Sequence, residues 1–141
     1  MRSASNMTAT KILDAYALIA FFEDEPGADF VRGLLLEAEA GNVRLAMSVV
    51  NLGEVWYSVA REVSPQQADS IVQEIRGMSI EIVDADWELT QRAAIYKSRG
   101  GISYADCYAA ALAKLRKADL VTGDPEFAKL KDEVTTVWNT K

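Results

Sequence analysis

The fold is decided by Lys11-Ile-Leu-Asp-Ala-Tyr-Ala-Leu-Ile-Ala-Phe-Phe22. Its first four residues, Lys11-Ile-Leu-Asp14, predict a short buried strand that ends in an acid, and Ala17–Phe22 predicts an apolar helix. A strand that runs into a helix is the repeating unit of parallel sheets, because the helix returns the chain to the start of the next parallel strand. The same alternation continues through the rest of the chain.

Four further strands are predicted, at Arg44–Met47, Ile80–Val83, Leu120–Thr122 and Thr135–Trp138. The intervening helices are predicted at Ala28–Ala40, from Ser48 to about Arg61, from Ser64 to about Gly77, from Asp84 to about Lys97, and from Ser103 to about Lys117, with a helical turn at Pro125–Leu130. This order predicts an α/β protein with a parallel sheet and helices on both faces.

At 141 residues, of which 50% are hydrophobic, the chain is sized for a single globular domain. We expect that domain to span residues 7–141, with Met7 as the natural start and residues 1–6 as additional N-terminal residues or an expression scar. The longest apolar run, Ala15–Phe22, is too short to span a bilayer, so no membrane association is expected. Cys107 is the single cysteine, which excludes an internal disulfide and favours a cytoplasmic location.

The chain contains no histidine. This excludes Ser-His-Asp and Cys-His catalytic sites, histidine general-base catalysis and zinc sites built from His and Cys. Carboxylate sites for Mg²⁺ or Mn²⁺ remain. The net charge of −6 argues against broad, non-specific nucleic-acid binding but is compatible with a nuclease whose acids surround a metal.

Four acids border apolar segments, at Asp14, Glu54, Asp106 and Asp124. Two follow predicted strands and two lie near the starts of predicted helices, and these positions meet at one edge of a parallel sheet. Clustered carboxylates repel one another, and a divalent cation removes that cost. Such a centre is suited to phosphodiester hydrolysis, because the metal polarises the phosphate and lowers the pKa of a bound water.

Each acid alone also has a structural explanation: a helix N-cap for Asp14, a capping box for Asp106, a turn for Asp124 and an exposed helical position for Glu54. Asn51 lies one turn before Glu54 and can orient it. Nearby side chains have two explanations as well. Tyr16, Tyr57 and Tyr104 can stack on a base or simply pack, and Arg61, Lys97, Arg99 and Lys117 can guide a polyanion or simply face solvent.

Four short motifs, in this order and spacing, resemble those of PIN-domain ribonucleases, specifically the VapC-type toxins of type II toxin–antitoxin systems. The motifs are Leu13-Asp14-Ala15-Tyr16-Ala17-Leu18, Asn51-Leu-Gly-Glu54-Val, Ser103-Tyr-Ala-Asp106-Cys-Tyr-Ala-Ala-Ala and Leu120-Val-Thr-Gly-Asp124-Pro-Glu-Phe127. The resemblance extends from about Lys11 to Trp138. One position departs from it, since many members carry Ser, Thr or Asn where this chain has Tyr16.

The resemblance implies a PIN-like three-layer α/β/α fold with a central parallel sheet of about five strands. It implies an endoribonuclease that depends on Mg²⁺ or Mn²⁺, in which Asp14, Glu54, Asp106 and Asp124 are the catalytic and metal-binding residues. It also implies an RNA substrate, a homodimer, and inhibition by a cognate VapB-like antitoxin whose tail occupies the active-site groove.

Three other functions are compatible with parts of the sequence. Asp14-Ala15-Tyr16 resembles the start of haloacid-dehalogenase-type hydrolases, in which the Asp is a nucleophile, but those enzymes continue with Gly-Thr where this chain has Ala17-Leu18. A response-regulator receiver domain would carry paired acids at the end of the first strand, and here there is one. A PIN-like module that binds a partner without cleaving RNA is the non-enzymatic alternative.

Overall fold

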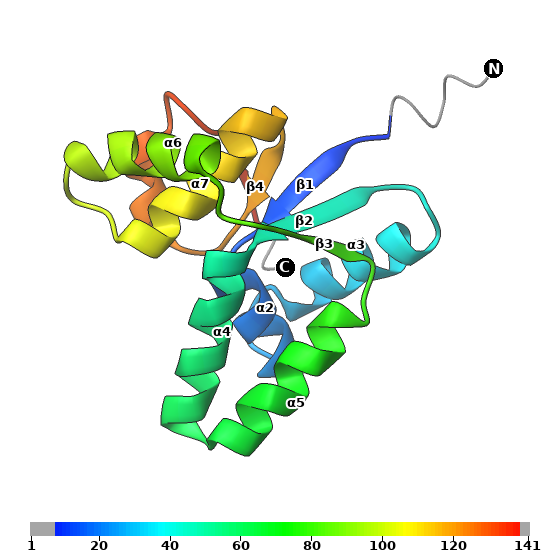
Figure 1. The fold of residues 1–141 in the computed structure, drawn as a ribbon. Helices are drawn as coiled ribbons and strands as arrows, with labels where there is room; N and C mark the ends of the chain where they lie inside the picture. The colour runs from blue at the N-terminus through cyan, green and yellow to red at the C-terminus, as the bar shows by residue number, and fades with distance from the viewer. Residues whose placement is uncertain (1–7, 139–141) are drawn as a thin grey trace.

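Five parallel strands form one sheet, in the order β3-β2-β1-β4-β5 (Figure 1). The computed structural model describes residues 8–138, so the predicted start at Met7 lies outside the described residues. The strands are β1 (Thr10–Leu13), β2 (Arg44–Ser48), β3 (Ile80–Val83), β4 (Asp119–Val121) and β5 (Thr136–Val137). The parallel α/β architecture predicted from the alternation of strands and helices is confirmed.

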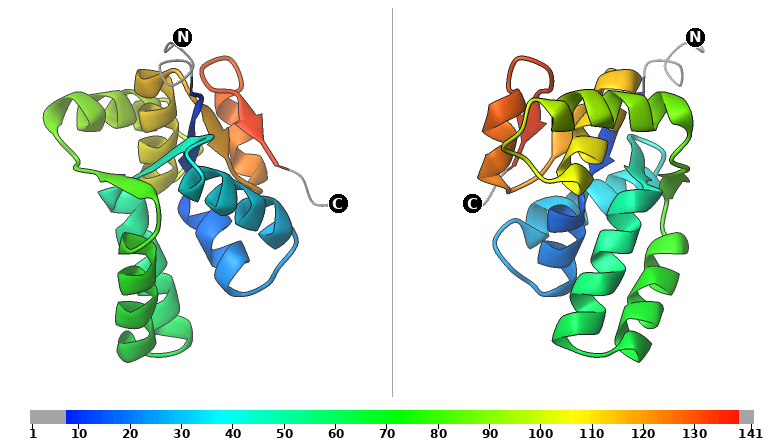
Figure 2. Two further views of the ribbon diagram at one scale, coloured as in Figure 1. Left: turned by 90° about the vertical axis from the view of Figure 1, so that its right-hand side faces the viewer. Right: turned by 60° about the vertical axis from the view of Figure 1, so that its left-hand side comes forward.

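Helices cover both faces of the sheet (Figure 2). One face carries α6 (Trp87–Ser98), α7 (Tyr104–Arg116) and the 3-10 helix η1 (Pro125–Leu130). The other face carries α2 (Ala15–Phe22), α3 (Ala28–Glu39), α4 (Val49–Glu62) and α5 (Pro65–Arg76). Successive strand residues point to opposite faces, so Ile12 packs under the first group of helices and Leu13 under the second.

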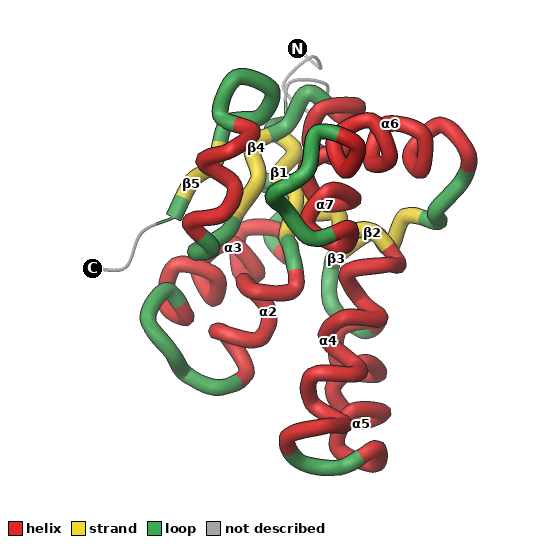
Figure 3. Tube along the Cα trace, turned by 90° about the vertical axis from the view of Figure 1, so that its left-hand side faces the viewer, coloured by secondary structure: helices red, strands yellow, loops and turns green. Residues whose placement is uncertain are grey.

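Helices α4 and α5 pack against each other and extend away from the sheet (Figure 3). The contact between these two helices includes a 2.8 Å hydrogen bond from Trp56 Nε1 to Asp69 Oδ1. No helix in the described part of the chain is both long and apolar enough to cross a bilayer.

Two helix starts differ from the prediction. Helix α2 begins at Ala15 rather than Ala17, because Asp14 itself caps it. Helix α6 begins at Trp87, and the predicted cap at Asp84 is wrong. The Asp86 carboxylate accepts a 3.0 Å hydrogen bond from the Leu89 amide, so of the two aspartates available it is Asp86 that caps the helix.

The strand order reverses between β1 and β4, because the chain passes from β3 across the sheet to the far side of β1. In open parallel sheets, ligands bind beyond the carboxyl ends of the strands at such a reversal. Leu13 is paired with Val121 there. The residues that follow, Asp14 and Thr122, therefore leave the sheet side by side.

Helix α7 brings a third acid to this edge. It lies against β1, β2 and β4 on a face of small residues, including Cys107, Ala109, Ala110 and Ala113, all of which are buried. Small side chains let the helix axis approach the sheet closely, so Asp106 in its first turn is drawn toward the strand ends rather than into solvent.

Candidate functional site

Asp14 lies directly after β1 and is 1% exposed. Its Oδ1 accepts a 2.9 Å hydrogen bond from the Ala17 amide and caps α2. Its Oδ2 is buried and has no hydrogen-bond partner among residues 8–138. A buried carboxylate oxygen of this kind is costly unless a proton or a cation neutralises it. Helix capping therefore accounts for one oxygen of Asp14 and leaves the other available to a ligand.

Asp106 lies in the first turn of α7 and is 8% exposed. Its amide donates a 3.2 Å hydrogen bond to the Ser103 hydroxyl, which is the N-cap of the helix. The predicted cap is thus present, and it holds Asp106 at a defined point of the turn. The carboxylate is buried next to other acids rather than solvated, which a simple capping role does not require.

Asp124 lies in the turn after β4. The Thr122 hydroxyl accepts a 3.0 Å hydrogen bond from its amide, and its own Oδ1 accepts a 2.9 Å hydrogen bond from the Glu126 amide at the start of η1. This turn brings a fifth acid into the site: carboxylate oxygens of Asp106, Asp124 and Glu126 all lie within 4.8 Å of one another. Oxygen ligands at this separation can share one hard cation.

Glu126 is not among the four acids predicted from the sequence. It lies within the last motif, two residues after Asp124, where an exposed helical position is the ordinary expectation. The tight 3-10 turn that begins at Pro125 is what folds its carboxylate back toward Asp106. The sequence signal that could have identified Glu126 is its position two residues after Asp124, which caps η1.

Glu54 is half-buried on α4 and is held by Asn51. The Asn51 Nδ2 donates to Glu54 Oε1 at 3.4 Å and to the Ala105 carbonyl at 3.0 Å. Its Oδ1 accepts a 2.8 Å hydrogen bond from the Ser48 hydroxyl. Asn51 is fully buried, so this network is shielded from water. The prediction that Asn51 orients Glu54 is confirmed, and the same amide also ties α4 to the start of α7.

The acids perturb one another electrostatically. Burial raises the pKa of Asp14 to about 7, although the Thr122 hydroxyl and the Ala17 amide act in the opposite direction, and the charges of Asp106 and Glu54 add to the rise. Burial also raises the pKa of Asp106 to about 7, with further contributions from Asp124 and Glu54. The pKa of Glu54 is raised by burial and then by Asp124. The four predicted acids therefore form one coupled group, in which a divalent cation would relieve the repulsion.

Three of the cations considered as guides for a polyanion already have partners. Lys97 Nζ donates to the Ile102 carbonyl at 2.9 Å, and Arg99 pairs with Glu133 at 3.2 Å. The Arg61 guanidinium lies over the Tyr57 ring, 5.4 Å from its centroid. Lys97 thus supports the loop that leads into α7 and Asp106.

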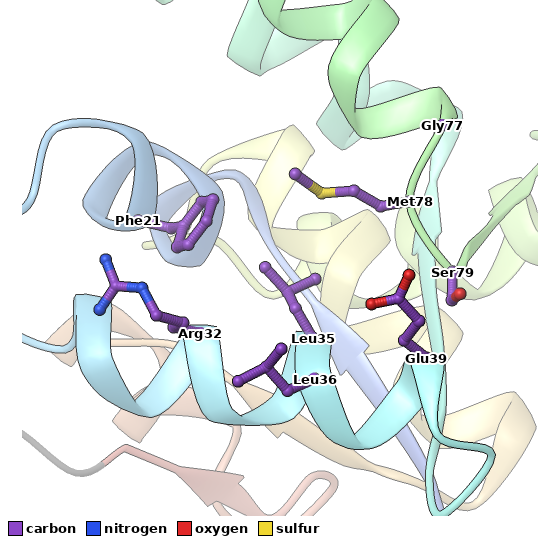
Figure 4. Close-up of a pocket in the computed structure, with 8 residues that line it drawn as sticks. All are labelled: Phe21, Arg32, Leu35, Leu36, Glu39, Gly77, Met78 and Ser79. Atoms are coloured by element: carbon purple, nitrogen blue, oxygen red, sulfur yellow. The ribbon is translucent and has the colours of Figure 1, made fainter.

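A separate apolar recess lies between α3 and the end of α5 (Figure 4). It is lined by Phe21, Arg32, Leu35, Leu36, Glu39, Gly77, Met78 and Ser79. The Arg32 guanidinium lies over the Phe21 ring, 5.5 Å from its centroid. None of the clustered acids lines this recess, so it is distinct from the carboxylate site.

The sequence matches the model of the PIN domain family over residues 11–133. Among curated proteins, none matches it significantly. The fold is similar to that of several solved structures. VapBC2 from Rickettsia felis, bound to a DNA fragment of its promoter, has a TM-score of 0.71 at 21% identity, with 92% of this chain and 99% of that chain covered.

VapC20 from Mycobacterium tuberculosis, described as a toxin that cleaves the sarcin-ricin loop, has a TM-score of 0.70 at 13% identity, with 93% of this chain and 100% of that chain covered. DNA-bound VapBC from Salmonella typhimurium has a TM-score of 0.69 at 18% identity, with 92% and 97% covered. The shared fold and the family match set aside the dehalogenase and receiver alternatives. The chain belongs to the PIN domain family, and its three-layer fold is that of the VapC toxins.

Proposed function

We propose that this PIN domain is a metal-dependent endoribonuclease that hydrolyses RNA phosphodiester bonds, with Asp14, Glu54, Asp106 and Asp124 as its catalytic and metal-binding residues. The observation that carries the proposal is Asp14: a fully buried carboxylate with an unpartnered oxygen, coupled to Asp106 and Glu54 at the reversal of strand order. A purely structural acid would have both oxygens satisfied or exposed to water.

The donor set suits Mg²⁺ or Mn²⁺. Every group available is a carboxylate oxygen, and hard divalent cations prefer oxygen ligands. Asp106 and Asp124 would hold the ion, with Glu126 close enough to assist. The unpartnered oxygen of Asp14, whose charge is coupled to that of Asp106, would be a further ligand. When bound, the ion would polarise the phosphate and lower the pKa of a water. A carboxylate oxygen that does not contact the ion, such as the Glu54 Oε1 that accepts from Asn51, would orient the attacking water.

We further propose that the chain is the toxin of a VapBC-type pair, with a cognate VapB-like antitoxin as its partner and a homodimer as its working form. The solved relatives from Rickettsia felis and Salmonella typhimurium are VapBC complexes, which supports an antitoxin partner for this chain. The RNA target of such a toxin lies in the cytoplasm, the compartment that an unpaired cysteine also favours.

The proposal is tested by cleavage of total RNA with purified protein in Mn²⁺ and in EDTA. We expect cleavage in Mn²⁺, none in EDTA, and a roughly hundredfold or greater loss in Asp106→Asn, because a preorganised charge at the reacting phosphate is removed. Asp29→Asn is the matched control, since Asp29 is exposed and pairs with Arg32 on α3.

Two results would contradict the proposal. Full activity of Asp106→Asn with cleavage that survives EDTA would exclude a metal mechanism. A wild-type protein that binds RNA and metal but cleaves no RNA would favour the silent binding module instead.

A further inference from the structure

We infer that the exposed ring of Tyr16 is a stacking surface for a nucleobase beside the phosphodiester bond that is cut. This inference rests on the proposed nuclease function and adds a base-contacting residue to it.

The Tyr16 ring lies at the rim of the carboxylate site. Tyr16 is in the first turn of α2, two residues after Asp14, and its side chain is 45% exposed. Its ring also reaches the turn that carries Asp124: a Cβ placed on Gly123 would lie 2.6 Å from Tyr16 Cε1. The ring is thus next to Asp14 along the chain and next to the Asp124 turn in space.

A second aromatic side chain holds the Tyr16 ring in place. Trp138 meets it edge to face, with 5.7 Å between ring centroids and an interplanar angle of 86°. Trp138 is in turn packed against Phe30 at 6.5 Å. A Cβ on Gly123 would lie 2.7 Å from Trp138 as well, so the absence of a side chain there lets both rings close over the turn. A ring that is already fixed loses little conformational entropy when a base stacks on it.

Stacking suits the charge of this protein. The net charge is −6, and three of the cations that could guide an RNA backbone, Lys97, Arg99 and Arg61, are already engaged within the chain. Every base has a π-face, so stacking contributes affinity without a basic groove. Bases in a duplex are stacked on each other and do not offer their faces, so the ring selects unpaired nucleotides.

Two other exposed tyrosines can be compared with Tyr16. Tyr57 is 48% exposed, but the Arg61 guanidinium lies over its ring. Tyr104 is 43% exposed and packs against Tyr108, with 5.1 Å between ring centroids, much as Tyr16 packs against Trp138; Tyr16 is preferred because its ring also reaches the turn that carries Asp124. Tyr57 is therefore a matched control for Tyr16, since it has the same chemistry and a similar exposure but an occupied ring face.

The test measures RNA binding without cleavage. Binding of a short fluorescent oligoribonucleotide, as a single strand and as a duplex, is followed by anisotropy in Mn²⁺ with Asp106→Asn as the parent protein. Adding Tyr16→Phe should leave single-strand affinity unchanged, and adding Tyr16→Leu should weaken it about tenfold. Tyr57→Leu should have no effect, and duplex affinity should be the same in all variants.

A 2-aminopurine base in the same single strand gives a second measurement. Its fluorescence should be quenched by the parent and by Tyr16→Phe but not by Tyr16→Leu, an effect that a purely structural role would not produce. Thermal unfolding checks that each variant is folded. If Tyr16→Leu unfolds, Tyr16→Met fills the same space without a π-face.

The inference is overturned if Tyr16→Phe and the aliphatic variant bind the single strand with equal affinity. It is also overturned if the aliphatic variant loses as much affinity for the duplex as for the single strand. These outcomes are distinct from failure of the proposed function. In that case the wild-type protein would cleave no RNA in Mn²⁺, whatever the Tyr16 variants do to binding.

Discussion

Replacing Asp14 by Asn should stabilise the metal-free protein at about pH 8. Burial raises the pKa of Asp14 from 3.8 to about 7, so ionising it in the folded state is unfavourable. At roughly 1.4 kcal/mol for each pH unit, this difference costs about 4 kcal/mol of folding free energy once the pH exceeds 7. Asn carries no charge and removes that cost.

The sign of the effect follows from the direction of the pKa shift. A raised pKa in the folded state means that the favourable contribution of the protonated acid is complete below pH 3.8 and is lost as the pH rises to about 7. Asn also caps helices as well as Asp does, so the bond to the Ala17 amide survives. The new amide nitrogen takes the place of Oδ2, and if it has no partner there, as Oδ2 has none, the unpaired group costs about 1–3 kcal/mol.

The net gain at about pH 8 is therefore about 1–3 kcal/mol, or roughly 3–10 °C in the unfolding midpoint. At about pH 5.5 only about half of the ionisation cost is present, so variant and wild type should unfold at nearly the same temperature. Thermal unfolding in EDTA at both pH values measures the difference. Added Mn²⁺ should stabilise the wild type at pH 8 far more than the variant.

Asp86→Asn is the matched control. Asp86 caps α6 through a 3.0 Å bond to the Leu89 amide, as Asp14 caps α2, but it is exposed. Its substitution should change the midpoint little at either pH. The reasoning is refuted if Asp14→Asn lowers the midpoint at pH 8 in EDTA, or if the difference from wild type is the same at both pH values.

Asn51→Ala should lower the free energy of unfolding in urea by about 1–3 kcal/mol, because the Ala105 carbonyl loses its buried donor. RNA cleavage should be lost as well. An unchanged unfolding midpoint would contradict the role of this network. Gly123→Ala should cost about 1–3 kcal/mol through overlap with the two aromatic rings, whereas Gly33→Ala, in an open helical position, should be neutral or stabilising in the same thermal assay. Glu126→Gln should weaken Mn²⁺ binding in calorimetry, and equal affinity would remove this residue from the site. In the same experiment on the wild type, affinity should rise with pH up to about 7, because both buried aspartates must lose protons before they can bind the cation.

Local patterns were sufficient for the elements and for the class of fold. Hydrophobic periodicity and capping residues depend on neighbours a few positions apart, so the alternation of strands and helices could be predicted. The errors lie at helix starts, where Asp84 and Asp86 are equivalent cap candidates until the packing of Leu89 chooses between them. Four acids and the absence of histidine likewise restricted the chemistry to carboxylates and a hard cation.

The contacts between distant segments were decided by the tertiary structure alone. The reversal of strand order places Asp14 beside the turn that carries Asp124, more than a hundred positions later, and the small face of α7 buries Asp106 against them. The unpartnered oxygen of Asp14, the approach of Glu126, and the position of the Tyr16 ring over Gly123 all follow from that packing. Burial and desolvation arise only when segments meet. Which acids are present can therefore be read from the chain alone, whereas which of them lie together, and at what electrostatic cost, depends on the packing.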